Sequence, residues 1–134
     1  MRPRLGRLRQ RADFLRVAGT RVRQAMPGLV LQAAPMPDAA KAEAEIRLGF
    51  TASRKVGNAV ARNRARRRLK EAARLVLAEA GRPDTDYVLI CREATLARDF
   101  EELKGDIALG LRKVGARLER AADAPRTADR EPTS

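Results

Sequence analysis

The side chains with the clearest chemistry lie in one basic run over residues 54–74. Nine of its 21 residues are Arg or Lys, and its single acid is Glu71. Guanidinium groups at this density bind phosphates, often in a bidentate geometry. Ordinary exposed helices mix the signs of their charges, so that residues four positions apart attract each other. A solvated helix surface is the plain alternative, but one acid cannot neutralise this run, so the sequence predicts a surface that binds a polyanion.

The spacing of residues in this run indicates a helix with two faces. At 3.6 residues per turn, small and aliphatic side chains recur on one side and polar or basic side chains on the other. The predicted packing stripe is Ala61, Ala65, Leu69, Ala72 and Val76, and the opposite side is Asn63, Arg67, Lys70 and Arg74, flanked by Arg64, Arg66 and Arg68. We therefore predict a helix that packs by a narrow, mostly alanine stripe and presents a broad basic face.

Side chains for catalysis by the protein itself are scarce. The chain has no His, so no Ser-His or Cys-His nucleophile can be assembled. Metal-dependent nucleases need clustered carboxylates. The close acidic pairs are Asp84/Asp86, Glu43/Glu45 and Glu101/Glu102, and we interpret all of them as surface or capping residues. We predict no catalytic residue and no metal ligand in this chain.

The net charge of +12 is distributed unevenly. Residues 1–80 contain 19 basic and 6 acidic side chains, whereas residues 81–134 contain 10 basic and 11 acidic ones. This is the distribution expected of a binding face on a neutral support. The single cysteine, Cys91, excludes an intrachain disulfide and a sulfur-based zinc site. No apolar run approaches the ~18 residues of a membrane span, and the N-terminus lacks a secretory signal, so we expect a cytoplasmic protein.

A length of 134 residues predicts one domain with a modest core. We expect a basic, loosely ordered arm over residues 1–11, because it is rich in Arg and lacks a packing pattern. A single RNA-binding α/β domain follows over residues 12–120. Residues 121–134 are polar with two prolines, and this composition predicts a disordered C-terminal tail.

The expected order of elements within the domain is helix, two or three strands, helix, strand, helix. Helices are predicted over residues 12–18, over the basic run and from Phe100, where Asp99 and Glu102 form a capping pair. Strands are predicted over residues 28–34, 45–53 and 86–92. The number of strands before the basic helix is two or three, depending on whether residues 21–24 form a further short strand. One sheet with helices packed on it is the natural architecture.

Residues 47–67 read Arg-Leu-Gly-Phe-Thr-Ala-Ser-Arg-Lys-Val-Gly-Asn-Ala-Val-Ala-Arg-Asn-Arg-Ala-Arg-Arg. This segment resembles, without a gap, the hallmark of the protein subunit of bacterial ribonuclease P. Further matches are Asp13-Phe14 before a Gly, Asp86-Tyr87-Val88 opening an apolar strand, and Phe100-Glu101-Glu102-Leu103 opening the last helix. The resemblance covers about residues 7–118.

The resemblance implies an α/β (α+β) sandwich similar to one ribosomal-protein domain, with about four strands in a mixed sheet and three helices. The basic helix there lies in a left-handed crossover between parallel strands. Ribonuclease P removes 5′ leaders from precursor tRNA. Its catalyst is an RNA subunit with bound Mg²⁺, and its protein subunit supports binding and specificity. The implied partners are therefore the catalytic RNA and precursor tRNA, with Mg²⁺ bound mainly by the RNA subunit and substrate. No membrane and no DNA are expected, and the protein alone is expected to be inactive.

The family's functional positions carry over to two sets of residues. The first set is implied to contact the catalytic RNA: Arg54, Lys55, Asn58, Arg62, Asn63, Arg64, Arg66, Arg67, Lys70 and Arg74. The second set lies in or beside the segments that form the leader-binding cleft: Phe14, Val17, Gln32, Phe50 and Ser53. Strand alternation puts Phe50 on the face opposite Ser53, so Phe50 is either a cleft residue or a core residue.

Three positions depart from the family pattern. Family members often carry aromatic residues where this chain has Ala18 and Gln32, and Arg68 replaces a usually apolar residue. Aromatic residues make up only 3% of the chain. Base stacking, worth ~1–3 kcal/mol per base, should therefore contribute less here, unless arginine stacking compensates.

Other classes of protein remain as alternatives. The main one is a ribosomal-type structural RNA-binding protein without a role in tRNA processing. A basic region of the leucine-zipper type is opposed by Glu71, which stands where that class needs Arg, and by Gly81 and Pro83. A free-standing nuclease would have to cleave RNA with magnesium alone.

Overall fold

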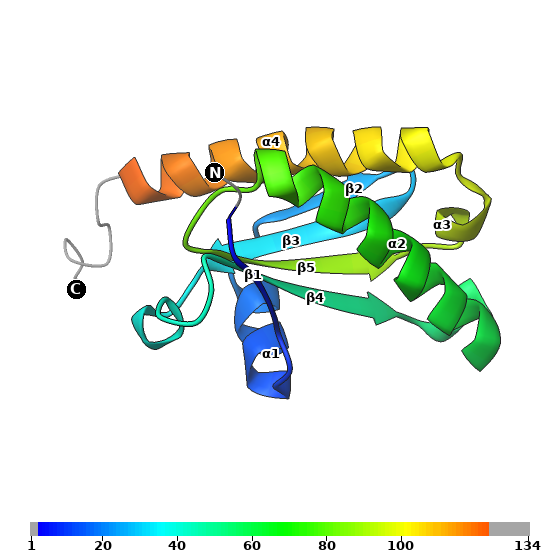
Figure 1. Ribbon diagram of the computed structural model, residues 1–134, viewed down its shortest axis with the longest axis horizontal. Helices are drawn as coiled ribbons and strands as arrows, with labels where there is room; N and C mark the ends of the chain where they lie inside the picture. Colours follow the sequence, from blue (N-terminus) through cyan, green and yellow to red (C-terminus); the bar gives the residue numbers. More distant parts are fainter. Residues whose placement is uncertain (1–2, 124–134) are drawn as a thin grey trace, which may run out of the picture.

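The computed structural model describes residues 3–123, which form one five-stranded sheet with helices on both faces (Figure 1). The strands are β1 (Leu5–Arg7), β2 (Arg23–Met26), β3 (Leu29–Pro35), β4 (Ile46–Ala52) and β5 (Thr85–Cys91). Their order across the sheet is β1-β4-β5-β3-β2. β4 runs parallel to β1 and β5, while β3 is antiparallel to β5 and to β2. The predicted α/β class and mixed sheet are confirmed.

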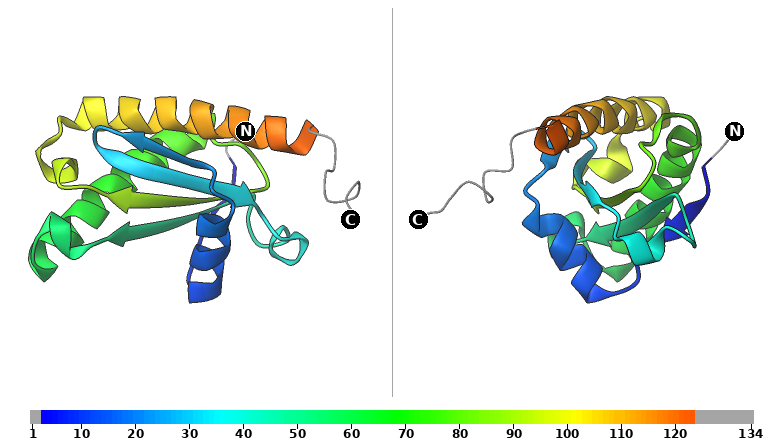
Figure 2. Two further views of the ribbon diagram at one scale, coloured as in Figure 1. Left: turned by 180° about the vertical axis from the view of Figure 1, so that it is seen from behind. Right: turned by 90° about the vertical axis from the view of Figure 1, so that its left-hand side faces the viewer.

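The helices form two layers around this sheet. They are α1 (Arg11–Gly19), α2 (Ala59–Ala80), α3 (Ala94–Ala97) and α4 (Phe100–Asp123), with short 3₁₀ turns η1 (Asp38–Ala40) and η2 (Arg54–Val56). The long helices α2 and α4 cover one face, and α1 packs against the other (Figures 1 and 2). α2 connects the parallel neighbours β4 and β5, as the family resemblance implied.

The first strand corrects the expectation of a loosely ordered arm over residues 1–11. Residues 5–7 pair with residues 46–48 of β4. The amide of Leu8 then donates to the carbonyl of Leu48 at 2.9 Å, and the Leu8 side chain is buried. The sheet therefore has five strands rather than about four. Three residues without alternation carry no local signal for a strand, because this one is specified by its pairing with β4.

The last helix begins as predicted and ends later than predicted. Asp99 Oδ2 accepts hydrogen bonds from the amides of Glu101 at 3.0 Å and Glu102 at 3.3 Å, which confirms the cap. The helix continues to Asp123, so residues 121–123 of the expected tail are helical. The remainder of that tail, residues 124–134, lies outside the described residues.

The larger hydrophobic core lies between the sheet and the two long helices. The apolar stripe of α4 is buried in it, namely Leu103, Ile107, Leu111, Val114 and Leu118. Tyr87 is fully buried in the same layer, where burial raises the pKa of its phenol and its oxygen accepts the Arg82 amide at 3.1 Å. Burial also raises the pKa of the Cys91 thiol to about 11, so Cys91 packs as a neutral, unreactive side chain.

A buried carboxylate fastens α1 to the opposite face of the sheet. The Asp86 side chain has 0% exposure and accepts Arg47 Nε at 2.9 Å and Nη2 at 2.7 Å. Arg16 of α1 also donates to Asp86, and Asp13 of α1 completes the cluster at 3.5 Å from Arg47. The hydrogen bonds that Arg47 donates to the Asp86 carboxylate raise the pKa of Arg47. The interpretation of Asp86 as a surface or capping residue is therefore wrong.

This cluster yields a first prediction. Asp86→Asn removes the charge that two arginines share, and breaking a buried ion pair typically destabilises by about 3–5 kcal/mol. We expect the free energy of unfolding, measured by urea titration, to fall by about 3 kcal/mol. Asp38→Asn is the matched control, because the Asp38 side chain is 97% exposed beside Lys41 and such solvent-exposed ion pairs contribute little to stability. Equal effects of the two substitutions would contradict the role of the cluster.

Candidate nucleic-acid interface

α2 has the two faces that its spacing predicts. Its buried residues are Ala65, Leu69, Ala72, Ala73 and Leu77, while Ala61 and Val76 of the predicted stripe are half-buried. Most of these side chains are small, so the helix backbone can lie close to the sheet. The long cationic side chains are left for the outer side and the flanks.

The entry into α2 is shaped by three residues of the hallmark motif. Ser53 Oγ accepts the amide of Lys55 at 3.3 Å, and Asn58 Oδ1 accepts the amide of Ala61 at 2.9 Å as the N-cap of the helix. Between them Gly57 has a φ of 143°, a conformation that glycine adopts without strain. Asn58, which the family resemblance assigns to RNA contact, thus also caps the helix.

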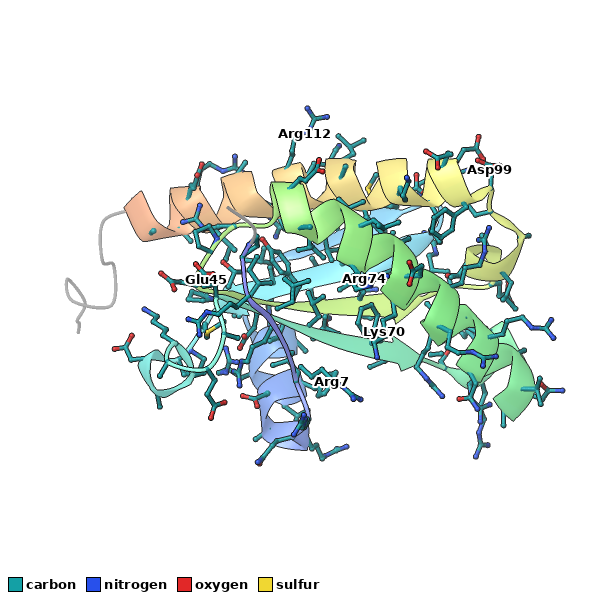
Figure 3. The ribbon with its side chains drawn as sticks, viewed as in Figure 1. Arg7, Glu45, Lys70, Arg74, Asp99 and Arg112 are labelled. Carbon is teal, nitrogen blue, oxygen red and sulfur yellow. The ribbon has the colours of Figure 1, made fainter. Side chains whose placement is uncertain are left out.

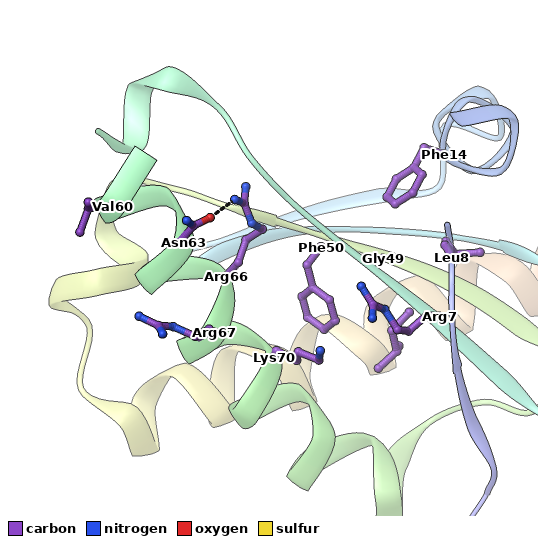
Figure 4. Close-up of a pocket in the computed structure, with 11 residues that line it drawn as sticks. Arg7, Leu8, Phe14, Gly49, Phe50, Val60, Asn63, Arg66, Arg67 and Lys70 are labelled. Atoms are coloured by element: carbon purple, nitrogen blue, oxygen red, sulfur yellow. Dashed lines mark hydrogen bonds between the residues drawn. The ribbon is translucent and has the colours of Figure 1, made fainter. Parts of the chain in front are cut away.

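Two arginines of the predicted RNA-binding set are oriented by local hydrogen bonds. Arg62 is half-buried, and its Nη1 donates to the Gly57 carbonyl at 3.0 Å. Arg66 donates to Asn63 Oδ1 one turn earlier (Figure 4). A guanidinium carries five N–H donors, so each group is fixed in direction and keeps donors for a ligand.

The remaining cations of the basic face are more exposed. Arg64, Arg67 and Lys70 are exposed, and within residues 3–123 none of them pairs with a carboxylate. Arg74 differs, because it pairs with Glu71 at 2.7 Å. A face of uncompensated positive charge attracts a polyanion and gains nothing from folding alone.

Arg68 departs from the family pattern for a structural reason. Its Nη1 donates to the Thr95 carbonyl of α3 at 2.7 Å. Its guanidinium carbon also lies 5.8 Å from the centre of the Phe100 ring of α4, within cation–π range. Arg68 therefore anchors α2 to the two following helices and is turned away from the basic face.

A hollow of about 590 Å³ opens where β1 ends, and we call it the edge hollow (Figure 4). β1 stops pairing at Arg7, so the outer edge of β4 is uncovered from Gly49 onward. One wall is the basic face of α2. The cations that line the hollow are Arg7 from β1 and Arg66, Arg67 and Lys70 from α2.

Phe14 and Phe50 both line the edge hollow, from opposite faces of the sheet. Phe14 of α1 lies over Gly49, where an added Cβ would stand 2.5 Å from the Phe14 ring, so only glycine leaves room. Phe50 lies on the side of α2 and packs partly against the larger core. The open question about Phe50 is thereby answered, because its ring belongs to the core and also to the wall of the hollow.

A second hollow of about 870 Å³ lies on the face that carries α1, and we call it the sheet-face hollow. Its apolar floor comes from Ala25, Val30 and Ile90, which are neighbours across strands. Ser53 lies at its side. The charged residues that line it are Arg23, Lys55, Arg92 and Glu93.

Three of the five predicted cleft residues line one or the other of these two hollows. Phe14 and Phe50 line the edge hollow, and Ser53 lines the sheet-face hollow. The prediction that Val17 lines a cleft is wrong, because its side chain is 0% exposed and packs in the small core under α1. Gln32 is half-buried on the face that carries α1 but is not among the lining residues of either hollow.

The predicted site residues do not include three cations that line the hollows, Arg7, Arg23 and Arg92. Arg7 falls in the segment predicted to be a loosely ordered arm, so nothing in the sequence linked it to α2. Arg92 follows Val88 and Ile90 at a period of two, and this alternation could have placed it on their face. Arg23 needed the register of β2 against β3, which the sequence alone does not specify.

Within residues 3–123 no group of three or more His, Cys, Asp or Glu side chains is arranged to hold a metal ion. None of the helices in that part of the chain is both long and apolar enough to cross a membrane. The groups present at the two hollows are guanidinium and ammonium donors, small hydroxyls and phenyl rings. These groups bind phosphates and stack on bases.

Comparison with known proteins agrees with these chemical features. A family model described as Ribonuclease P matches residues 2–115. The ribonuclease P protein component of Paramagnetospirillum magneticum is 50% identical over 129 residues, which cover 96% of this chain and 97% of that protein. The ribonuclease P protein component of Ruegeria pomeroyi is 56% identical over 110 residues, which cover 81% of this chain and 86% of that protein.

Solved structures show the same fold. The RNase P protein from Thermotoga maritima aligns with a TM-score of 0.66 at 25% identity, covering 80% of this chain and 96% of that one. The RNase P protein of Staphylococcus aureus aligns with a TM-score of 0.64 at 23% identity, covering 79% and 92%. The hallmark motif, the family match over most of the sequence and the shared fold together show that this chain belongs to the family of ribonuclease P protein components.

Proposed function

We propose that this chain assembles in the cytoplasm with the catalytic RNA of ribonuclease P, holds the 5′ leader of precursor tRNA and promotes removal of that leader. The observation that carries the proposal is the continuity of two surfaces. The exposed, uncompensated cations of α2 form one wall of the edge hollow, and Phe14 and Phe50 form another. One molecule can thus meet a folded RNA and a single strand side by side.

The basic face of α2 is suited to a folded RNA. Double-stranded RNA is recognised mainly through its shape, phosphates and 2′-hydroxyls, because its deep groove is too narrow for side chains. Arg64, Arg67 and Lys70 can reach phosphates freely, while Arg62 and Arg66 are already oriented by local bonds. This combination favours docking on the backbone of the catalytic RNA, without reading its sequence.

The hollows on either side of β4 are suited to a single strand. Phe14 offers a ring on which a base can stack, and the neighbouring cations can contact phosphates. A precursor tRNA has a leader to place there and the mature product has none. The enzyme would therefore bind substrate more tightly than product, which assists turnover.

In this proposal the cleavage step belongs to the RNA subunit, where bound Mg²⁺ would supply Lewis-acid chemistry. In the part of the chain that the structure describes, residues 3–123, no cluster of side chains fits a metal site. The buried carboxylates Asp86 and Asp106 are already bonded, Asp86 to Arg47 and Asp106 to Arg98 Nε at 2.9 Å and to the Gly28 amide at 3.0 Å. The chain contributes positive charge and position, so its effect should be largest when magnesium is scarce.

The basic face gives a prediction about assembly. Replacing Arg64, Arg67 and Lys70 together by Ala should weaken binding to the catalytic RNA and flatten its salt dependence. Each lost phosphate contact changes the slope of log K against log salt by about 0.7–0.9, so the triple variant should lose about 2–3 from that slope. The melting temperature should hold, because these side chains are exposed and Ala favours helix.

The matched control is the triple Ala variant of Arg112, Lys113 and Arg120. These three side chains are exposed on α4, and Arg112 points away from the sheet (Figure 3). The control removes the same charge, so it should leave the slope nearly unchanged. Equal losses in the two variants would show that net charge, and not the face of α2, binds the RNA.

A second prediction concerns the reaction. The catalytic RNA should remove the leader faster at low magnesium when this chain is present, and the chain without RNA should remove none. Cleavage is followed with a precursor tRNA labelled at its 5′ end over a magnesium series. If the rate of leader removal is unchanged although the protein is bound, the proposed function is contradicted and a purely structural RNA-binding role is favoured.

A further inference from the structure

The face of the sheet that carries α1 has almost no aromatic surface. The complete sequence contains three Phe, one Tyr and no Trp. Phe50, Tyr87 and Phe100 all belong to the core on the other face. Phe14 is therefore the only ring on this side, and base stacking can occur at one end of the face only.

A row of side chains leads from that ring to an arginine on the far strand. The register places four residues in line across the sheet: Gly49 on β4, Val88 on β5, Gln32 on β3 and Arg23 on β2. Phe14 lies over the Gly49 end. Three strand spacings separate the two ends, a span of about 14 Å. Arg23 thus stands across the open face from the stacking ring.

The sheet-face hollow beside this row is positively charged. Arg23, Lys55 and Arg92 line it, with Glu93 as the acid among its lining residues. All three cations are exposed, and in the described part of the chain none forms an ion pair. Arg92 is held in place, because its Nη1 donates to the Met26 carbonyl at 2.6 Å.

The floor of the hollow offers nothing that could identify a base. Ala25, Val30 and Ile90 present small aliphatic side chains, which have no π face and no hydrogen-bonding group. Charged groups around an apolar floor fit the phosphates of a strand that lies across it. The complementary ligand is a flexible polyanion, and the proposed function supplies one in the leader.

We propose that beyond the base stacked on Phe14 the leader is held through its phosphates and not through its bases, and that Arg23 is the residue that determines this mode of binding. The inference rests on the proposed function and adds a specificity to it. Leader binding by this chain tolerates any sequence in the outer leader and depends strongly on salt. Precursor tRNAs with different leaders are therefore bound alike.

The test uses the holoenzyme assembled from this chain and the catalytic RNA, with four forms of one precursor tRNA. These are the natural leader, a leader whose outer nucleotides are abasic, a leader whose outer linkages are neutral methylphosphonates, and the tRNA without a leader. The Kd of each is measured at one salt concentration. We expect the abasic form to bind within about 3-fold of the natural leader and the methylphosphonate form at least about 10-fold more weakly.

Variants at position 23 test whether Arg23 is responsible for this order of affinities among the four forms of the substrate. Arg23→Ala should weaken binding of the natural and abasic leaders equally and leave the methylphosphonate leader unaffected. Arg23→Lys keeps the charge without the planar guanidinium, so it should retain most of the affinity. Arg112→Ala, which removes an exposed charge from α4, is the control and should change none of the four values.

A complementary variant adds an aromatic ring to this face of the sheet, where Phe14 supplies the only one. Gln32 is the cross-strand partner of Arg23, and Gln32→Tyr places a ring in the row. This variant should bind the natural leader at least about 5-fold more tightly than the abasic leader, because it now stacks on a base. The same abasic leader should show no such loss with the original chain.

The outcomes separate the two proposals. If the tRNA with the natural leader and the tRNA without a leader have the same Kd, both the proposed function and this inference are contradicted. If the leader strengthens binding but the abasic form loses that gain, and the methylphosphonate form keeps it, the proposed function stands and the inference is overturned. Loss of affinity in Arg23→Lys equal to that in Arg23→Ala would indicate stacking by the guanidinium and would also overturn it.

Discussion

The ion cluster around Asp86 is the interaction on which the placement of α1 on the sheet, and with it the placement of Phe14, depends. Asp86 lies in β5, Arg47 in β4, and Arg16 and Asp13 in α1, so one buried carboxylate connects two parallel strands and a helix. α1 is only nine residues long and has little apolar surface with which to hold itself. The cluster fixes the helix on the sheet, and the helix in turn fixes Phe14. A structural charge thus positions the side chain that we propose stacks on a base of the leader.

Gly49 is the point where the two halves of the candidate interface meet. Its missing side chain lets Phe14 approach the sheet, and the uncovered edge of β4 begins at the same residue. On one side of this edge lie Phe50 and the basic face of α2, and on the other side lies the sheet face that ends at Arg23. In the proposed function, a single-stranded leader would pass from one face to the other around the end of β1. The hallmark motif, residues 47–67, contains both this glycine and the first turns of α2.

The features that could be predicted from the sequence are those that depend on a pattern within a few neighbouring residues. The stripe of α2, the alternation of β4 and the cap at Asp99 are local patterns, and the structure confirms them. The partners of Asp86 are 39 and 70 residues distant, so no window of sequence contains the cluster. Val17 and Phe14 share one side of α1 by spacing, and only packing decides that the first is buried and the second lines a hollow. The basic face of α2 could be predicted from the sequence, and the shape of the hollows could not.

Both edges of the sheet are formed by short strands that carry arginine. β1 has three residues and contains Arg7, and β2 has four and contains Arg23. An open edge with unpaired amides and carbonyls is a template for another copy of the chain, and short length and positive charge oppose that pairing. Side chains cover part of the β2 edge, because Arg117 of α4 donates to the Arg23 carbonyl and Arg92 donates to the Met26 carbonyl. Repulsion between like-charged copies would also protect the chain from aggregation, so the arginines proposed to contact RNA would keep the chain monomeric until the RNA arrives.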